Sequence, residues 1–381
     1  RYMELAGCLV DRRGDGSLGP GRFGSEYFQD HVAVREASTM AGHVVRQLYL
    51  TAGVADLYLE TGEQALYDAL MRQWSDMSEH HLFITGGVGS LHRGEAFGEP
   101  YVLPNESCYC ETCAQIASVM WNWRMLLATG EAKYADLVEL TLYNGFLSGV
   151  SLDGRGFFYV NPLQSTGADD NSGSTRSTRP EWFDCACCPP NVMRLIGSLG
   201  HYLATRDAQG LQVHQYAPST VRFEAHSGQR TLLRIETEYP WQGAVKITID
   251  ETGDDPWQLS LRVPGWAEGA SIHVNSQPCN AMAVPGAYVT LNRTWRVGDT
   301  VKLELPVAST LVLGHPRIES VRGCVAIQRG PIVYCLEQAD QAPSVDVMDV
   351  EIEPTGQMRD SWQPDLLDGV ISVQAEGYAV E

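Results

Sequence analysis

Six of the ten cysteines in this 381-residue chain fall in two short groups. The groups are Cys108-Tyr109-Cys110-Glu111-Thr112-Cys113 and Cys185-Ala186-Cys187-Cys188. Chance rarely clusters cysteines in this way, and buried free thiols, disulfides and a metal site are the three explanations. A chain of this length builds a full core without disulfides, and a bridge between neighbouring Cys187 and Cys188 is strained. We therefore favour metal ligation.

Side-chain direction narrows the choice of metal ligands. Side chains two residues apart share a face of an extended segment, so Glu111 and Cys113 are expected to project together and away from Cys108 and Cys110. Zinc binds thiolate and carboxylate ligands in a tetrahedron. A carboxylate is unusual in a purely structural zinc site. The predicted ligands of one Zn²⁺ ion are Glu111, Cys113, Cys187 and Cys188.

The second cysteine group also precedes a predicted helix. Cys187 and Cys188 stand before Pro189-Pro190 and a helix expected to begin near Asn191. The positive end of a helix dipole favours a thiolate and lowers the pKa of a thiol. Cys187 or Cys188 is therefore a candidate nucleophile.

Helical periodicity extends from about residue 35 to 205. Helices are therefore expected to position the two cysteine groups. Apolar residues at helical spacing predict helices through Val44 to Leu57, Leu66 to Trp74, Ile116 to Leu127, Glu131 to Leu147 and Asn191 to Thr205. A recurring Thr-Gly-Glu joins helices at residues 61–63 and again at 129–131. Such recurrence indicates stacked helical hairpins, which form either an open solenoid or a closed ring.

The pattern changes near residue 210 to short alternating runs separated by turns. These runs predict an antiparallel β-sandwich. The chain is thus expected to be an α+β protein with a helical domain at residues 1–209 and a β-sandwich region at residues 210–381. Residues 164–180 are expected to form a surface loop, and the last 40 residues carry little pattern.

Composition excludes several classes of partner. Lys and Arg number 27 against 47 Asp and Glu, which gives a formal charge of −20. Nucleic acids and anionic membranes are disfavoured, because they bind clustered cations. No apolar run is long enough to span a bilayer, and no signal peptide is visible. Reactive thiolates survive best in reducing compartments, so the cytoplasm is favoured.

Several ordered motifs resemble glycoside hydrolase family 127, the β-L-arabinofuranosidases. The resemblance runs from about residue 20 to at least 335. The motifs are Thr85-Gly86-Gly87-Val88-Gly89-Ser90, Gly94-Glu95-Ala96-Phe97, Leu103-Pro104-Asn105, Glu111-Thr112-Cys113-Ala114, Leu142-Tyr143-Asn144-Gly145, Phe158-Tyr159-Val160-Asn161-Pro162-Leu163 and Cys185-Ala186-Cys187-Cys188-Pro189-Pro190-Asn191.

The resemblance implies an (α/α)6-barrel catalytic domain followed by β-sandwich material. It implies a retaining exo-glycosidase that releases terminal β-L-arabinofuranose from an oligosaccharide or glycoconjugate. Cys187 would be the zinc-bound nucleophile, and Glu95 would be the general acid/base. His43 and Tyr159 would line the sugar pocket. Without the resemblance, Glu95 would be an ordinary surface carboxylate, His43 a satisfied histidine and Tyr159 a core aromatic residue.

The family's pattern begins well upstream of Arg1, so the resemblance implies a partial barrel, which by itself is expected to be impaired in activity. Cys108 and Cys110 enlarge the first cysteine group relative to the family. Two alternatives stay open: a related glycosidase for another furanose or pyranose, and a non-catalytic, zinc-stabilised carbohydrate-binding protein. The natural glycan and the oligomeric state, a homo-oligomer included, are not determined by the sequence.

Overall fold

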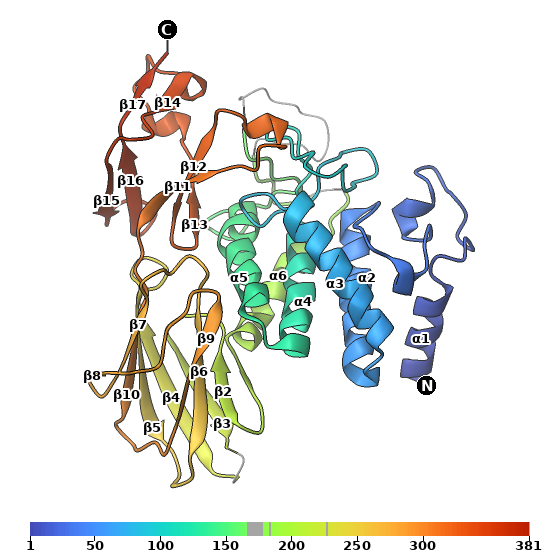
Figure 1. Cartoon of the computed structure of the whole chain (residues 1–381). Helices are drawn as coiled ribbons and strands as arrows, with labels where there is room; N and C mark the ends of the chain where they lie inside the picture. The colour runs from blue at the N-terminus through green and yellow to red at the C-terminus, as the bar shows by residue number, and fades with distance from the viewer. Residues whose placement is uncertain (166–177, 183, 226–227, 381) are drawn as a thin grey trace. The chain divides into compact units, whose positions relative to one another are not determined.

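The computed structural model describes the chain except for residues 166–177, 183, 226–227 and 381 (Figure 1). The described residues divide into two units. The first comprises Arg1–Gly130, Leu137–Ser198 and Gly314–Cys324, and the second comprises Glu131–Asp136, Leu199–Leu313 and Val325–Glu381. Both cysteine groups lie in the first unit.

The first unit is mainly helical, as the periodicity predicted. The α-helices of the chain are α1 (Tyr2–Arg12), α2 (Val44–Thr61), α3 (Gln64–Asp76), α4 (Thr112–Thr129), α5 (Ala132–Leu140) and α6 (Cys188–Ser198). Short 3-10 turns occur at Ser25–Phe28, Val34–Glu36, Leu147–Gly149, Leu199–Tyr202, Glu319–Val321, Gln338–Asp340 and Val347–Asp349. Short π-helical turns occur at Met77–His81 and Thr141–Phe146.

Two glycines explain the recurring Thr-Gly-Glu sequence. Gly62 follows α2 with φ of 69°, and Gly130 follows α4 with φ of 72°. Their amides donate hydrogen bonds to the carbonyl oxygens of Tyr58 and Leu126. Because a side chain is strained in this left-handed region, glycine ends both helices in the same way.

Helix α2 packs against both α3 and α4. The largest fully buried apolar side chains of these helices include Leu48, Leu66, Leu70, Ile116 and Trp121. Burying a Leu or Ile side chain contributes about 1.5–3 kcal/mol. The Nε2 atom of Gln47 also donates a 2.7 Å hydrogen bond to Oε1 of Gln73. These contacts fix the N-termini of α2 and α4, where two predicted site residues, His43 and Glu111, are found.

The predicted helix near Asn191 differs from the structure. Helix α6 begins at Cys188 and ends at Ser198, and Thr205 lies in the first β-strand. Proline fits the first turn of a helix, so Pro189 and Pro190 are inside α6 rather than ahead of it. The second cysteine group is thereby part of the helix start.

The second unit contains the β-strands, which begin at Ala204, slightly before the change of pattern predicted near residue 210. They are β1 (Ala204–Arg206), β2 (Gly210–Val213), β3 (Ser219–Glu224), β4 (Arg230–Thr237), β5 (Ala244–Glu251), β6 (Trp257–Val263), β7 (Ser271–Val274), β8 (Gln277–Pro278), β9 (Ala287–Arg293), β10 (Thr300–Glu304), β11 (Ser309–Leu313), β12 (Val325–Arg329), β13 (Ile332–Tyr334), β14 (Val350–Ile352), β15 (Met358–Gln363), β16 (Val370–Ala375) and β17 (Gly377–Ala379).

Two sheets form the sandwich part of this unit. One has the strand order β1-β2-β6-β9 and the other β3-β4-β5-β10-β7-β8. The rings of Phe223 on β3 and Trp257 on β6 are 5.3 Å apart, so the two sheets contact each other through buried aromatic residues. The expectation of a purely antiparallel arrangement is wrong for one pair, because β2 and β6 are parallel. Between β2 and β6 the chain forms β3, β4 and β5 of the other sheet. It then re-enters the first sheet in the same direction as β2.

The C-terminal region is more regular than its weak sequence pattern suggested. Strands β11-β12-β13 form a three-stranded sheet, and β14 with β17 and β15 with β16 form two antiparallel pairs. Most side chains of β14 to β17 are partly or fully exposed. Their polar and apolar residues therefore alternate weakly, which hides the strands from a periodicity argument.

Most of the loop expected at residues 164–180 lies outside the described residues. In the part of the chain that is described, no helix combines the length and apolar character needed to cross a membrane. The closed (α/α)6 ring stays a prediction.

Candidate active site

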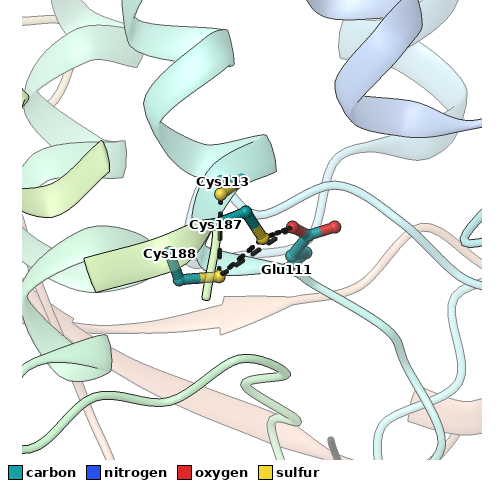
Figure 2. Close-up of side chains that lie close together, drawn as sticks. All are labelled: Glu111, Cys113, Cys187 and Cys188. Atoms are coloured by element: carbon teal, nitrogen blue, oxygen red, sulfur yellow. Dashed lines mark hydrogen bonds between the residues drawn. The ribbon is translucent and has the colours of Figure 1, made fainter. Parts of the chain in front are cut away.

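Glu111, Cys113, Cys187 and Cys188 come together in the first unit (Figure 2). One ligand atom from each of these residues lies within 4.8 Å of the others. The sulfur of Cys188 is 3.6 Å from that of Cys113 and 3.7 Å from that of Cys187. Oε1 of Glu111 is 3.4 Å from the sulfur of Cys187 and 3.9 Å from that of Cys188. The described cysteines are all free thiols, so disulfides do not account for the two groups.

These separations fit a tetrahedral zinc ion. Ligand sulfurs about 2.3 Å from zinc are about 3.8 Å apart at the corners of a tetrahedron, and a sulfur and an oxygen are about 3.5 Å apart. Oε2 of Glu111 is buried and has no hydrogen-bond partner among the described residues. A buried carboxylate oxygen without a partner is costly. The donor set and the geometry therefore suit a metal ion bound by these four side chains.

Glu111 and Cys113 are positioned by the N-terminus of α4. Glu111 is the N-cap residue, and Cys113 is in the first turn. Glu111 also forms an isolated β-bridge with Val160, and the amide of Thr112 donates a 2.9 Å hydrogen bond to the carbonyl oxygen of Tyr159. The two ligands thus lie together because the chain bends into a helix. The expectation that the two side chains lie together is met. The predicted cause, a shared face of an extended segment, is wrong because Glu111 and Cys113 lie at the start of a helix.

Cys108 and Cys110 pack elsewhere. Both are buried in a cluster with Phe83 and Leu103. Cys110 has φ of 28°, which turns the chain just before Glu111. This turn, rather than simple alternation, directs the two thiols away from the four-residue cluster.

The N-terminus of α6 presents the other two sulfurs. Cys188 is its first residue and is buried, while Cys187 precedes it. Pro189 and Pro190 lack amide hydrogens, so the first turn offers fewer donors to a thiolate than the sequence argument assumed. The amide of Cys187 donates a 3.0 Å hydrogen bond to the carbonyl oxygen of Cys185. Backbone geometry and neighbouring sulfurs, more than free helix amides, define the surroundings of Cys187.

A tyrosine on α2 holds α6 in place. Nδ2 of Asn191 donates a 2.9 Å hydrogen bond to the hydroxyl oxygen of Tyr49, and Nη2 of Arg194 donates another at 2.6 Å. Tyr49 is six residues, about 1.7 turns, along α2 from His43. The same helix therefore positions His43 and the helix that carries Cys188.

Neighbouring groups shift the pKa values of the three thiols in different directions. Hydrogen bonds from Cys113 and then Cys188 hold the pKa of Cys187 far below its ordinary value. The pKa of Cys113 is raised, chiefly by its hydrogen bond with Cys187. The pKa of Cys188 is raised, chiefly by its hydrogen bond with Cys113. Burial raises the pKa of Glu111 well above its usual range. Cys187 is therefore the most easily ionised thiol of the cluster.

Glu95 is paired with His43. Nε2 of His43 lies 3.0 Å from Oε2 of Glu95, and the amide of Val44 donates a 2.9 Å hydrogen bond to the carbonyl oxygen of Glu95. The hydrogen bond from His43 lowers the pKa of Glu95, although burial acts in the opposite direction. Glu95 has φ of 51°, an uncommon conformation for a residue with a side chain. Such strain is typical of functional residues held by their surroundings.

Two tyrosines, Tyr109 and Tyr159, lie between Glu95 and Cys187 in the hydrogen-bond network. The ring of Tyr159 packs edge-on to that of Tyr109 at 6.2 Å, and its hydroxyl lies 3.9 Å from the sulfur of Cys185. A hydrogen bond from Tyr109 contributes to the lowered pKa of Glu95, and one from Tyr159 contributes to the lowered pKa of Cys187. Sequence reasoning identified Tyr159 but missed Tyr109. Its place inside the first cysteine group, two residues before Glu111, was the available indication.

Family models match the chain over three consecutive regions. The model described as "Beta-L-arabinofuranosidase, GH127 catalytic domain" matches residues 1–201. Models of the GH127 middle domain and of the glycoside hydrolase family 127 C-terminal domain match residues 210–307 and 309–372. The resemblance found in the sequence is confirmed.

Individual proteins support the same conclusion. The chain is 37% identical to a non-reducing end β-L-arabinofuranosidase of Bifidobacterium longum subsp. longum, over 98% of this chain and 60% of that protein. The crystal structure of a GH127 β-L-arabinofuranosidase from Geobacillus stearothermophilus T6 matches with a TM-score of 0.92 and 35% identity, over 100% of this chain and 65% of the other. A second GH127 β-arabinofuranosidase structure gives a TM-score of 0.92 and 36% identity, over 99% and 60%. The chain thus spans 60–65% of the length of these relatives.

Proposed function

The chain belongs to glycoside hydrolase family 127, and on that premise we propose that the protein is a retaining exo-glycosidase that releases terminal β-L-arabinofuranose. Its substrate would be an oligosaccharide or glycoconjugate that carries this sugar at the non-reducing end. In this proposal Cys187 is the nucleophile and Glu95 is the general acid/base. His43 and Tyr159 line the sugar pocket.

One observation carries the proposal: the thiol of Cys187 and the carboxyl group of Glu95 lie in the same unit, and each is held by buried neighbours. Cys187 is held by the sulfur cluster, and Glu95 is held by its 3.0 Å contact with His43. Glycosidases need one group that faces the anomeric carbon and another that exchanges a proton with the leaving oxygen. A thiolate can take the first role in place of a carboxylate.

The residues that would hold zinc are Glu111, Cys113, Cys187 and Cys188. When bound, zinc would favour the thiolate form of its sulfur ligands and fix their positions. Unlike a purely structural set of four cysteines, this set includes the carboxylate of Glu111, whose Oε2 atom has no other partner among the described residues. The unpartnered oxygen supports a site that is completed by a cation.

The first chemical step forms a carbon–sulfur bond. The Cys187 sulfur attacks the anomeric carbon with its electron pair while the bond from that carbon to the leaving oxygen breaks. Protonated Glu95 transfers its proton to the departing oxygen. The products of this step are a thioglycosyl-enzyme, the released alcohol and an ionised Glu95.

The second step reverses these roles. Ionised Glu95 accepts a proton from water as the water oxygen bonds to the anomeric carbon, and the carbon–sulfur bond breaks. Cys187 leaves as a thiolate and Glu95 is protonated again. Two inversions retain the configuration of the released arabinose. The pairing with His43 suits this step because it favours the ionised form of Glu95.

We also propose that residues 1–209 contribute to an (α/α)6-barrel catalytic domain and that residues 210–381 form a β-sandwich region. Helices α2 and α4 are capped by Gly62 and Gly130 and are each followed directly by another helix, which supports the first assignment. The two sheets joined through Phe223 and Trp257 support the second.

The test uses the full-length gene product that contains this sequence and a panel of aryl furanosides and pyranosides. Release of the aryl group from β-L-arabinofuranoside, with a sugar-sized mass on Cys187 after rapid quenching, is expected. Turnover of a different glycoside would keep the enzyme class and replace the sugar. Sugar binding without turnover of any substrate would contradict the proposal in favour of a carbohydrate-binding protein.

A further inference from the structure

A row of rings leads from Glu95 toward solvent. Nε2 of His43 contacts Glu95, and the ring of His43 lies 5.3 Å from that of Tyr27 at an angle of 62°. The ring of Tyr27 lies 5.0 Å from that of Phe23 at an angle of 36°. Phe23 is 38% exposed, whereas His43 is buried. The row therefore connects the proposed acid/base to the surface without a break.

The rings of this row also lie against the backbone next to Glu95. A β-carbon placed on Gly94 would be 3.7 Å from ring atoms of both Phe23 and Tyr27. Ordinary van der Waals contact occurs at this distance. The rings of Phe23 and Tyr27 therefore lie beside Gly94, the residue that precedes Glu95.

Several interactions fix the segment that carries these rings. The side-chain amide of Gln29 donates hydrogen bonds to the carbonyl oxygens of Ala41 at 3.2 Å and of His43 at 3.3 Å. The guanidinium of Arg46 lies 4.6 Å from the centre of the Tyr27 ring. A cation over an aromatic face is stabilising. The rings are therefore held in a set position instead of being free to collapse over Glu95.

The row lies on the acid/base side of the reaction. In a displacement at the anomeric carbon, the nucleophile and the leaving group occupy opposite faces of the sugar. Cys187 contacts Glu111 and Cys188, whereas the ring row packs against His43 and lies beside Gly94. A carboxyl group must be within about 2.6–3.2 Å of the oxygen that it protonates. The leaving group, which is attached to that oxygen, consequently lies close to the residues that surround Glu95.

We propose that Phe23 and Tyr27 form the binding surface for the leaving-group sugar, the ring that departs when terminal arabinofuranose is cleaved. This inference rests on the proposed function and extends it from the sugar that is released to the part of the substrate that is left behind. Sugar rings have apolar C–H faces that pack on aromatic side chains, and ligand sites are commonly lined by aromatic residues with a few polar groups. Phe23 is the partly exposed ring, with the guanidinium of Arg22 5.3 Å from its centre, and Tyr27 packs against it at an angle of 36°.

The test compares two substrates in the full-length gene product that contains this sequence. One is a disaccharide with terminal β-L-arabinofuranose, and the other is methyl β-L-arabinofuranoside, whose leaving group has no ring. Phe23→Leu is expected to lower kcat/KM for the disaccharide at least tenfold, mainly through KM, and to change kcat/KM for the methyl glycoside less than twofold. Phe23→Tyr, which keeps an aromatic face, is expected to restore most of the loss. Unchanged melting temperatures check that both variants fold.

Equal losses on both substrates would overturn the inference, because Phe23 would then act on the released sugar or on the fold. Equal rates of wild type and Phe23→Leu on the disaccharide would overturn it as well. In both cases wild-type turnover leaves the proposed function standing. A wild-type enzyme that cleaves neither substrate would instead overturn the proposed function and this inference together.

Discussion

The sulfur atoms of Cys113 and Cys188 lie 3.6 Å apart although 75 residues separate them in the chain. Cys113 is in the first turn of α4, and Cys188 is the first residue of α6. Two helix N-termini therefore meet at one point. Of the four side chains gathered at this point only Cys187 has a lowered pKa, through hydrogen bonds from Cys113 and Cys188, whereas burial raises the pKa of Glu111.

Metal content is the most direct consequence of this geometry. We expect one zinc ion per chain by elemental analysis. Cys113→Ser is expected to weaken zinc binding at least tenfold and to lower the melting temperature, because bound metal stabilises the folded state. Cys108→Ser is the matched control, since Cys108 is a buried thiol outside the cluster. Loss of zinc from Cys108→Ser but not from Cys113→Ser would mean that other thiols hold the ion.

The proposed nucleophile makes a second prediction. Cys187→Ala is expected to lower kcat on an activated β-L-arabinofuranoside by roughly a thousandfold or more, because the attacking atom is lost. The sugar-sized mass should disappear from the protein at the same time. Cys8→Ser, which changes an exposed thiol on α1, serves as the control and should keep wild-type turnover. Near-normal rates in Cys187→Ala would remove Cys187 from the proposed role.

The pairing of His43 with Glu95 predicts a pH dependence. The hydrogen bond from His43 lowers the pKa of Glu95, and Glu95 must be protonated to act as the acid. Because kcat/KM then falls as pH rises through the pKa of Glu95, activity should be greatest at acid pH. His43→Leu removes the donor and raises this pKa, so the alkaline limb of the kcat/KM profile should move to higher pH.

His43→Gln is the control for that profile, because its side-chain amide is still a hydrogen-bond donor. It should move the alkaline limb less than His43→Leu does. The position of the limb, not the height of the profile, is the quantity to compare, since both variants alter the sugar pocket. A limb that stays in place or moves to lower pH in His43→Leu would show that His43 does not set the pKa of Glu95.

A substitution at Gly42 tests how tightly the residues before α2 are packed. It has φ of 65°, and a β-carbon there would be 1.8 Å from the carbonyl oxygen of Glu26. Gly42→Ala is therefore expected to lower the free energy of unfolding by about 3 kcal/mol or more. Gly53→Ala, in the middle of α2 with open space around it, should raise it by roughly 0.5–1 kcal/mol. Denaturant midpoints measure both changes, and similar effects at the two glycines would contradict the packing described here.

Much of the fold could be predicted from the sequence because it depends on local patterns. The helical spacing of Val44 to Leu57 and of Ile116 to Leu127 predicted α2 and α4, and Gly62 and Gly130 marked their ends. Alternation of apolar residues predicted β2 to β7, β9 and β10, but not β1, the two-residue strand β8 or β11 to β13. Alternation is weak where both faces of a strand are exposed, so β14 to β17 were missed.

The grouping of cysteines indicated the chemistry, and the family resemblance indicated which residues to compare. The sequence alone thus determined the residue types, the helices that carry them and the family. It could not show that α6 starts at Cys188, that a turn at Cys110 rather than alternation separates Cys108 from the cluster, or that Tyr109 and the ring of Tyr27 adjoin the residues around Glu95. Those contacts depend on residues that are not neighbours in the chain. Only tertiary packing fixes the backbone conformation at each turn and so brings these residues together.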